Sequence, residues 1–379
     1  MQNPFKFDVE VSGPFFCGRE SDIETVLSYI ENQTNLIMFA KRRVGKSSLV
    51  KEVFEHRLPA GMLYAHVDIY AVSNIRELYE RLRAGIEEAI ARSESSLERL
   101  ARLVGELQEL FVGAKVSLVV SGTPKVQIES TQRDYYGAIR DLFEGFFAFL
   151  QKKDRRAVIA IDEFQKIVSL PESERVETLL RTIVNKRVNC SFLFTGSKRN
   201  ILLAMFNDAG RAFFKLGAET PLDPIDEEEF YEWTRKRFLR KSVHLEREAF
   251  AHLYRESDGE TRFIQQVCHE LFRSRKSESV IDTGTMERTI REVIGRKSFF
   301  GQYLDSFSPA QQNTLKIVAV TDGREIYASE VLEAYETSKS TAQSAVKSLT
   351  QKGVLFTEAD GRISFEDVEF RLWLKYGAL

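Results

Sequence analysis

Short apolar runs alternate with amphipathic stretches along the first half of the chain. Five of the runs have the length of buried strands and are rich in Val, Ile, Leu and Phe. Two of the intervening stretches repeat apolar side chains every three or four residues, as one face of a helix does. Strands that alternate with helices require crossover connections, so we predict an α/β fold with a parallel sheet covered on both faces. The strands are expected at residues 36–40, 62–70, 157–161, 191–195 and 213–218, and the two helices at residues 75–90 and 136–150.

Residues 93–131 interrupt this alternation. They contain one more helical pattern, followed by two short apolar stretches at residues 116–120 and 126–128. The sequence Gly-Thr-Pro at residues 122–124 favours a turn between these stretches. We therefore predict a helix and a β-hairpin that are inserted into the sheet domain.

The pattern changes after Pro221, where the strand-like runs stop. Four helical patterns follow and predict a small all-α unit at residues 222–300. Three further helical patterns in residues 301–379 precede two short apolar stretches, and Asp360 and Gly361 between these stretches favour a tight turn. Three helices followed by a hairpin are typical of a winged helix-turn-helix domain. The helices are expected at residues 226–239, 246–256, 261–274, 285–297, 309–320, 329–334 and 338–352, and the last strands at residues 354–358 and 362–365.

A basic loop joins the first predicted strand to the helix that follows it. In such a loop, backbone N–H groups and the helix N-terminus bind phosphate. Lys46 is placed to reach the β- and γ-phosphates of ATP, and the Ser47 hydroxyl is placed to ligate Mg²⁺. Ala40 stands where this motif has glycine, and because alanine resists positive φ, we expect the loop to begin with ordinary dihedral angles. The predicted site for ATP or ADP consists of Ala40, Lys41, Arg42, Arg43, Val44, Gly45, Lys46, Ser47 and Ser48. A basic turn before a helix is the alternative.

Two adjacent carboxylates end the predicted strand at residues 157–161. Asp162 is expected to hold Mg²⁺, and Glu163 is expected to orient and deprotonate the attacking water. A solvated strand end is the alternative, and the preceding phosphate loop favours the paired role. Thr195 and Ser197 end the next strand, where a hydroxyl can sense the γ-phosphate or the water, unless this is a simple serine-capped turn.

These three motifs, in this order, resemble those of the AAA+ and STAND ATPases, in particular the archaeal-type ATPases of prokaryotes. The resemblance extends over nearly the whole chain. It implies a parallel-sheet P-loop NTPase domain of the AAA+ type at residues 1–221, a helical lid at residues 222–300 and a winged helix-turn-helix domain at residues 301–379. Gly18 and Arg19 match a family segment near the adenine, which implies that they contact the nucleotide. A capping box of Ser21 and Glu24 at a helix start is the alternative explanation of this segment.

The resemblance also assigns roles to two arginines. Arg211 lies where AAA+ relatives carry an arginine finger that acts on a neighbouring subunit, although a local surface role is the alternative. Arg262 lies where origin-recognition-type ATPases have a sensor arginine at the start of a lid helix. The chain lacks the proline of the glycine–glycine–X–proline motif that marks strict STAND proteins.

Composition limits the class of protein. A chain of 379 residues has room for two or three domains, and its formal net charge of -2 gives no overall sign of nucleic-acid binding. The three cysteines are far apart and indicate neither a disulfide framework nor a zinc site. No apolar run has the roughly 20 residues that span a bilayer, and the N-terminus does not resemble a signal peptide. We therefore expect a soluble cytoplasmic protein without membrane contact.

Three functions fit these patterns. The first is an ATP-driven conformational switch whose winged helix contacts DNA. The second is the same ATPase with a winged helix that binds protein, for sensing, defence or regulation, and self-association is a further predicted interaction. The third is a nucleotide-binding scaffold without turnover. The expected recognition helix offers Lys339, Gln343 and Lys347 for phosphate or base contact, but residues 308–379 contain eight basic and ten acidic residues. DNA and protein therefore both stay open as partners.

Overall fold

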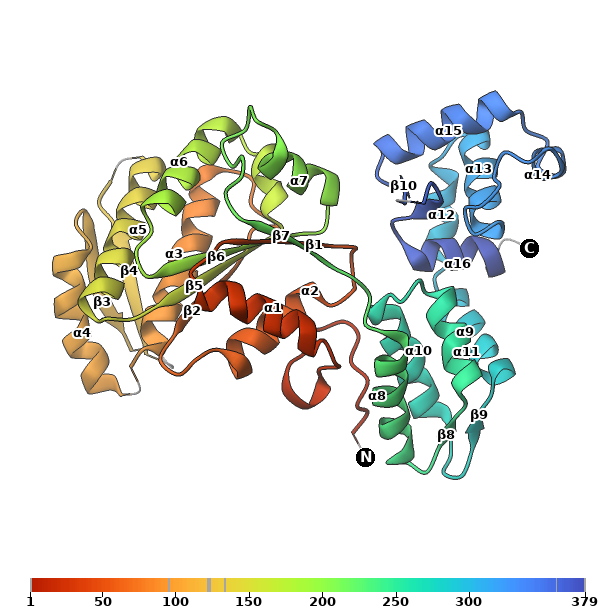
Figure 1. Ribbon diagram of the computed structural model, residues 1–379, viewed down its shortest axis with the longest axis horizontal. Coiled ribbons are helices and arrows are strands. Elements are labelled where there is room, and N and C mark those ends of the chain that lie inside the picture. The colour runs from red at the N-terminus through yellow and green to blue at the C-terminus, as the bar shows by residue number, and fades with distance from the viewer. Residues whose placement is uncertain (1, 95, 121–123, 133, 359, 378–379) are drawn as a thin grey trace. The chain divides into compact units, whose positions relative to one another are not determined.

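The computed structural model describes residues 2–94, 96–120, 124–132, 134–358 and 360–377, and the chain forms two compact units (Figure 1). The first, which we call the sheet unit, comprises Arg19–Lys41 and Lys46–Asp223. The second, which we call the helical unit, comprises the described residues up to Gly18, the four loop residues Arg42–Gly45, and the described residues from Pro224 onward. Four residues of the predicted phosphate loop therefore group with the C-terminal part of the chain.

A five-stranded parallel sheet forms the centre of the sheet unit, as predicted (Figure 1). Its strand order is β2-β5-β6-β1-β7. Three of its strands, β1, β5 and β6, are buried at every position, which is expected where helices cover both faces of a sheet. The strands are β1 (Leu36–Ala40), β2 (Leu63–Asp68), β5 (Ala157–Asp162), β6 (Cys190–Gly196) and β7 (Ala218–Leu222).

The predicted strand at residues 213–218 is wrong, because the fifth strand is Ala218–Leu222. Phe213 is fully buried, but its ring packs against the rings of Phe164, Phe194 and Phe206 and does not pair in the sheet. The true strand lies at an edge, where alternate residues are exposed and a proline is tolerated. The apolar run at Phe213 therefore indicates that these side chains are buried, and it does not indicate a strand.

Helices connect these strands, with α1 and α2 on one face of the sheet and α5 and α6 on the other (Figure 1). The apolar stripes that predicted α3 and α5 are the buried sides of those helices. Helix α2 continues directly into a short π-helical segment, Val53–Arg57. The helices are α1 (Glu20–Glu31), α2 (Lys46–Glu52), α3 (Ile75–Arg92), α5 (Tyr135–Lys152), α6 (Ser173–Lys186) and α7 (Arg199–Asn207).

Residues 93–131 contain one helix and a hairpin. Helix α4 (Leu97–Leu110) begins after Ser96, whose hydroxyl accepts a hydrogen bond from the backbone N–H of Arg99. Strands β3 (Ala114–Val119) and β4 (Lys125–Ser130) form a separate antiparallel sheet. The predicted turn residues Gly122 and Thr123 lie outside the described residues.

Four helices from residue 224 onward surround one apolar core of the helical unit. Two short strands pair in parallel beside them, so the prediction that strands stop after Pro221 is wrong. Each of these strands has two residues, which is too short to produce a readable apolar pattern. The elements are α8 (Glu227–Leu239), β8 (His244–Leu245), α9 (Arg247–Glu256), α10 (Thr261–Ser274), β9 (Val280–Ile281) and α11 (Thr283–Gly295).

The C-terminal segment has a second core within the helical unit. The last helix, α16 (Val368–Gly377), contributes side chains to both cores: Val368 and Leu372 to the first, and Phe370 and Leu374 to the second. Any change in the position of α16 therefore disturbs both cores. The other elements are α12 (Phe299–Asp305), α13 (Pro309–Val320), α14 (Ser329–Ala334), α15 (Lys339–Gln351), β10 (Leu355–Thr357) and β11 (Ile363–Phe365).

The three cysteines, Cys17, Cys190 and Cys268, are buried, and none of them forms a disulfide. Burial raises the pKa of the Cys190 and Cys268 thiols, so these two stay protonated and unreactive. No helix in the described part of the chain has both the length and the apolar character of a membrane span.

Candidate nucleotide-binding site

The predicted phosphate loop runs from the end of β1 at Ala40 to the start of α2 at Lys46. Ala40 has no positive φ, as expected, and the left-handed conformations lie further along the loop, at Arg43 (φ 67°) and Gly45 (φ 99°). A side chain at Gly45 would meet nothing within 4 Å. Glycine is therefore favoured at Gly45 by its backbone conformation and not by lack of space.

The carboxylate of Asp162 is the centre of a buried polar cluster in the sheet unit. Its Oδ1 accepts hydrogen bonds from the Lys46 ammonium, from Thr195 Oγ1 at 2.7 Å and from the Glu163 N–H at 2.8 Å. Its Oδ2 accepts a hydrogen bond from Ser47 Oγ at 2.8 Å. The strand ends of β5 and β6 and the first turn of α2 therefore converge on one acidic side chain, which is 5% exposed.

The electrostatics of Asp162 favour its ionised form. Burial acts to raise the pKa of this carboxyl, but neighbouring His66, Lys46 and Thr195 outweigh burial and hold the pKa well below its usual range. A carboxylate that stays ionised at all physiological pH values is suited to bind a cation. Ser47 and Asp162 together offer the hydroxyl and carboxylate oxygens that Mg²⁺ prefers.

Lys46 is buried, and its ammonium lies among three acceptors. Besides Asp162, it contacts Thr195 Oγ1 at 3.3 Å and Glu163 Oε1 at 3.7 Å. A flexible lysine with a compact charge can exchange a carboxylate for a phosphate oxygen without a change of fold. The predicted roles of Lys46, Ser47, Asp162 and Thr195 are therefore compatible with one another in space.

Glu163 follows directly after the strand and has a left-handed backbone (φ 56°), which is rare for a residue other than glycine. Its Oε2 accepts hydrogen bonds from Ser197 Oγ at 2.8 Å and from Gln165 Nε2 at 2.5 Å. The carboxylate is thus held by two donors on one oxygen, and its other oxygen faces the Lys46 ammonium. The structure brings Ser197 to the predicted base and Thr195 to the predicted metal ligand.

Two residues of this cluster were missed by the sequence analysis. His66 in β2 places Nε2 at 3.9 Å from Asp162 Oδ2, and this buried nitrogen has no hydrogen-bond partner. Gln165 holds Glu163, and its side chain also closes over Gly196, where an added side chain would come within 2.1 Å of it. No motif marks either residue, because their proximity depends on strand order and on a local turn.

The predicted arginine finger, Arg211, is bound within its own chain. Its guanidinium donates hydrogen bonds to both carboxylate oxygens of Glu177 in α6, with Nε at 3.1 Å from Oε2. Glu177 is 2% exposed, so this carboxylate depends on Arg211 for its charge compensation. The finger role stays a prediction, and it requires Arg211 to leave this partner.

Gly18 and Arg19, the pair predicted near the adenine, both have left-handed backbones, with φ of 59° and 68°. The Arg19 side chain is buried, and its Nη1 donates to Asp22 Oδ2 at 2.8 Å and to the Asp223 carbonyl at 3.0 Å. Helix α1 begins at Glu20 with Arg19 as its N-cap residue. The alternative of a capping box at Ser21 is therefore wrong, because Ser21 lies inside the helix.

Arg262 and the loop arginine Arg43 both lie in the helical unit and both contact carboxylates. The Arg262 guanidinium contacts Glu369 Oε1 at 3.1 Å and Asp8 Oδ1 at 2.9 Å. Arg43 Nη1 contacts Asp367 Oδ2 at 3.2 Å. The loop residues Lys41 and Arg42 are exposed, whereas Val44 is buried. The two arginines are thus held by acidic side chains of the same unit.

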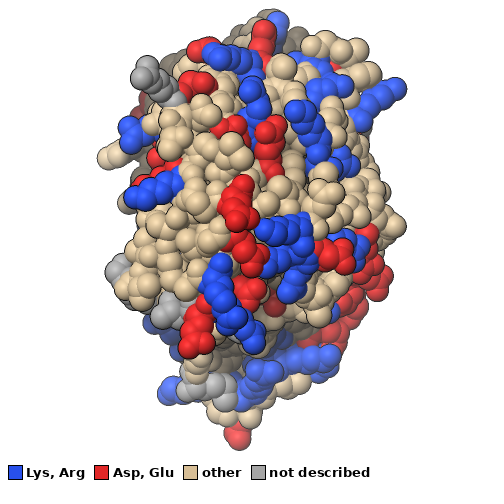
Figure 2. Space-filling view, turned by 90° about the vertical axis from the view of Figure 1, so that its left-hand side faces the viewer, with Lys and Arg blue, Asp and Glu red and all other residues tan. Residues whose placement is uncertain are grey.

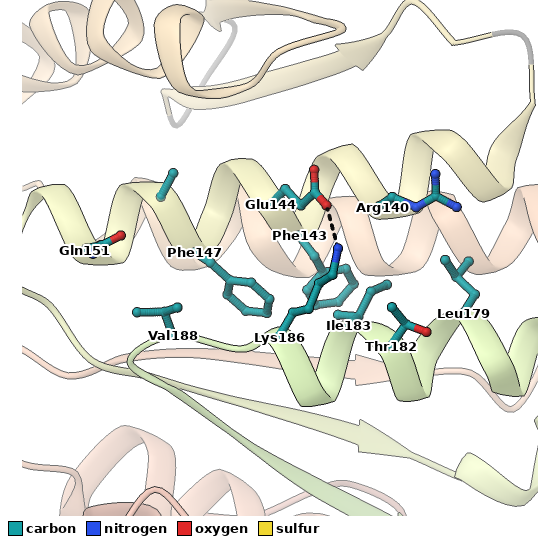
Figure 3. A pocket seen from close by; sticks show the side chains of 11 residues that line it. Arg140, Phe143, Glu144, Phe147, Gln151, Leu179, Thr182, Ile183, Lys186 and Val188 are labelled. Atoms are coloured by element: carbon teal, nitrogen blue, oxygen red, sulfur yellow. Dashed lines mark ion pairs between the residues drawn. The ribbon is translucent and has the colours of Figure 1, made fainter. Parts of the chain in front are cut away.

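A surface pocket of about 250 Å³ lies between α5 and α6 of the sheet unit. Phe143 and Phe147 point into it, and an ion pair of Glu144 and Lys186, at 3.6 Å, lies at its edge (Figure 3). None of the residues predicted to bind nucleotide lines this pocket. The polar cluster around Asp162, and not this apolar hollow, is the candidate site.

Comparisons with known proteins agree with this geometry. Residues 16–267 match the family of ATPase domains predominantly from Archaea. The chain is 24% identical over 362 residues to an uncharacterized ATP-binding protein of Methanocaldococcus jannaschii, covering 90% of this chain and 91% of that protein.

Solved structures show the same fold. The Walker-type ATPase of Pyrococcus abyssi is similar with a TM-score of 0.67 and 18% identity, over 98% of this chain and 99% of that chain. The ORC2 protein of Aeropyrum pernix, described as ADPNP-ADP complexes, is similar with a TM-score of 0.50 and 17% identity, over 99% and 98%. The P-loop ATPase fold of the sheet unit is therefore established.

Proposed function

Since the chain belongs to the family of ATPase domains found predominantly in Archaea, we propose that it binds ATP with Mg²⁺ and hydrolyses it to switch its conformation. The observation that carries this proposal is the cluster around Asp162. There, Lys46 and Ser47 from α2 and Thr195 from β6 converge on the ionised carboxylate that ends β5, and the carboxylate of Glu163 lies beside the Lys46 ammonium. The ADPNP-ADP complexes of the similar ORC2 protein support nucleotide binding.

Each side chain of the cluster has a distinct role in this proposal. Loop N–H groups and Lys46 bind the phosphates, while Ser47 and Asp162 hold Mg²⁺, whose charge stabilises the phosphate oxygens. Glu163, fixed by Ser197 and Gln165, accepts the proton of the attacking water. Among the described residues no group of three metal-ligating side chains exists. Mg²⁺ usually takes one or two protein ligands and keeps waters and phosphate oxygens as the others, so Ser47 and Asp162 would be enough to hold it.

We also propose that residues 222–300 act as the lid and residues 301–379 as a winged helix that carries the output. Helices α13, α14 and α15 followed by the β10–β11 hairpin support this assignment. Helix α15 exposes Lys339, Gln343 and Lys347, which favours contact with DNA. Figure 2 shows acidic and basic side chains interspersed on a face of the protein that does not include α15.

The decisive test of the ATPase is Lys46→Ala, with Lys51→Ala as the matched control on the same helix. We expect Lys46→Ala to abolish binding of labelled ATP, because the ammonium that compensates the phosphates is lost, while Lys51→Ala binds normally. Circular dichroism checks that both variants fold. Normal ATP affinity in Lys46→Ala would refute the assignment.

Titration of labelled duplex DNA at two salt concentrations, with and without ATP, tests whether the winged helix contacts DNA. DNA binding that is absent, or that ATP does not change, favours a protein partner.

A further inference from the structure

Glu369 in α16 is a buried carboxylate that contacts three cations. The side chain is 3% exposed, and its Oε1 lies 3.1 Å from Arg262 Nη1 and 3.2 Å from Lys297 Nζ. Its Oε2 lies 3.7 Å from Arg43 Nη1. Burying a carboxylate costs several kcal/mol unless cations compensate it, so these three contacts explain why Glu369 can be buried.

The backbone of the phosphate loop is held at the same place. The Arg43 carbonyl accepts a hydrogen bond from the Arg262 N–H at 3.1 Å, and the Val44 carbonyl accepts one from Thr261 Oγ1 at 3.0 Å. The first N–H groups of a helix have no partner within the helix, so the loop carbonyl satisfies one of the free donors at the start of α10. The carbonyl groups of loop residues 43–44 therefore accept hydrogen bonds from α10, and the Arg43 guanidinium forms an ion pair with Glu369 in α16.

We propose that Glu369 is an autoinhibitory clamp, which withholds Arg43 and Arg262 from the nucleotide and couples their release to a shift of α16. The proposal rests on the ATPase function argued above, because it assumes that phosphates compete with Glu369 for these arginines. When the phosphates take one or both arginines, Glu369 keeps Lys297 but loses part of the positive charge that compensates its burial. This loss favours movement of the side chain toward water, and α16 moves with it.

Helix α16 is suited to transmit this change, because its side chains belong to both cores of the helical unit. A shift that exposes Glu369 moves Val368 and Leu372 in one core and Phe370 and Leu374 in the other. The coupling is reciprocal, as any coupling between two binding sites must be. A partner that displaces α16 would therefore tighten ATP binding, and ATP would favour that partner.

The clamp is tested by Glu369→Gln, which keeps the shape of the side chain and removes its charge. The matched control is Glu333→Gln, which removes an exposed carboxylate from α14 of the same segment. In the full-length protein, Glu369→Gln is expected to tighten the Kd for labelled ATP by a factor of about 5–150, the usual range of such couplings, while Glu333→Gln leaves it unchanged. In the Arg43→Gln background, the effect of Glu369→Gln should become smaller.

Hydrogen exchange supplies a readout that a purely structural role would not change. ATP should increase amide exchange in residues 368–377 of the wild type, and the increase should be absent in Glu369→Gln. If Glu369→Gln does not fold, Asp367→Asn replaces it, because Asp367 is partly exposed and is the second carboxylate on Arg43. If the wild type binds ATP, and Glu369→Gln (or Asp367→Asn in its place) binds ATP with the same Kd as the wild type, the clamp is refuted and the ATPase stands. If none of these proteins binds ATP, the proposed function fails and the clamp fails with it.

Discussion

Glu260 provides a quantitative test of the electrostatics of the helical unit. It is the residue before α10, it is 4% exposed, and its Oε1 has no hydrogen-bond partner. Burial, together with the charges of Asp367 and Glu369, raises the pKa of Glu260 to about 8 against the opposing effect of Arg43 and Arg262. The usual pKa is 4.5. Over most of the pH range between 4.5 and about 8, Glu260 is therefore protonated in the folded protein and ionised in the unfolded chain.

The sign follows from proton counting. Where the folded state binds more protons than the unfolded state, the free energy of unfolding falls as pH rises. The stabilisation by the protonated Glu260 is complete below the unfolded pKa, and it is lost as pH rises through the folded pKa. At 1.36 kcal/mol per pKa unit, the loss amounts to about 2–3 kcal/mol between pH 5 and pH 7. Because the group is buried, solvent screening does not reduce this figure greatly.

Glu260→Gln keeps the shape of the protonated side chain and cannot titrate. Both tryptophans, Trp233 and Trp373, lie in the helical unit, so urea unfolding followed by tryptophan fluorescence reports this unit. From pH 5 to pH 7, the free energy of unfolding of the variant should rise by about 2–3 kcal/mol relative to that of the wild type. Glu248→Gln, an exposed carboxylate in the first turn of α9, should show no such gain. A difference that is flat with pH, or that falls, would refute the reasoning.

Three further outcomes are expected. Glu163→Gln should bind Mg·ATP and hydrolyse it more slowly by at least ~10² in a steady-state assay, because the base is lost; undetectable turnover in the wild type as well, alone and with candidate partners, would favour the scaffold. If Arg211 acts on a neighbouring subunit, activity per molecule should rise with protein concentration, as fingers contribute on the order of 10³–10⁵ in rate. Arg211→Ala should remove that rise, and mixing it with Glu163→Gln should restore part of the activity, whereas a flat concentration dependence would make Arg211 a local partner of Glu177. Phe213→Ala should lower the free energy of unfolding of the sheet unit by about 3–5 kcal/mol in a denaturant titration followed by circular dichroism, because it leaves a cavity among packed rings; a loss below about 1 kcal/mol would contradict the packing.

The sequence by itself determined the features that depend on nearby residues. Helix α10 begins at Thr261 and ends at Ser274, where its apolar period begins and ends, and the strand that ends at Asp162 was readable as one continuous apolar run. The parallel sheet followed from the alternation of strands and helices. The candidate residues at the phosphates also followed, because the loop motif and the two carboxylates are each contiguous in the chain.

Only the tertiary structure decided what lies beside what. His66 lies close to Asp162 because β2 is the neighbour of β5 in the sheet. The pattern of apolar residues predicts where strands occur and does not predict their order in the sheet. The apolar residues around Phe213 are buried by packing of aromatic rings. A segment buried in this way has the same apolar composition as a buried strand, so the sequence alone does not distinguish the two. The clamp joins Arg43 to Glu369 across most of the chain, and α16 was not predicted at all. Local patterns determine backbone conformation because they act through neighbouring residues, whereas ion pairs and shared cores arise only when distant segments meet.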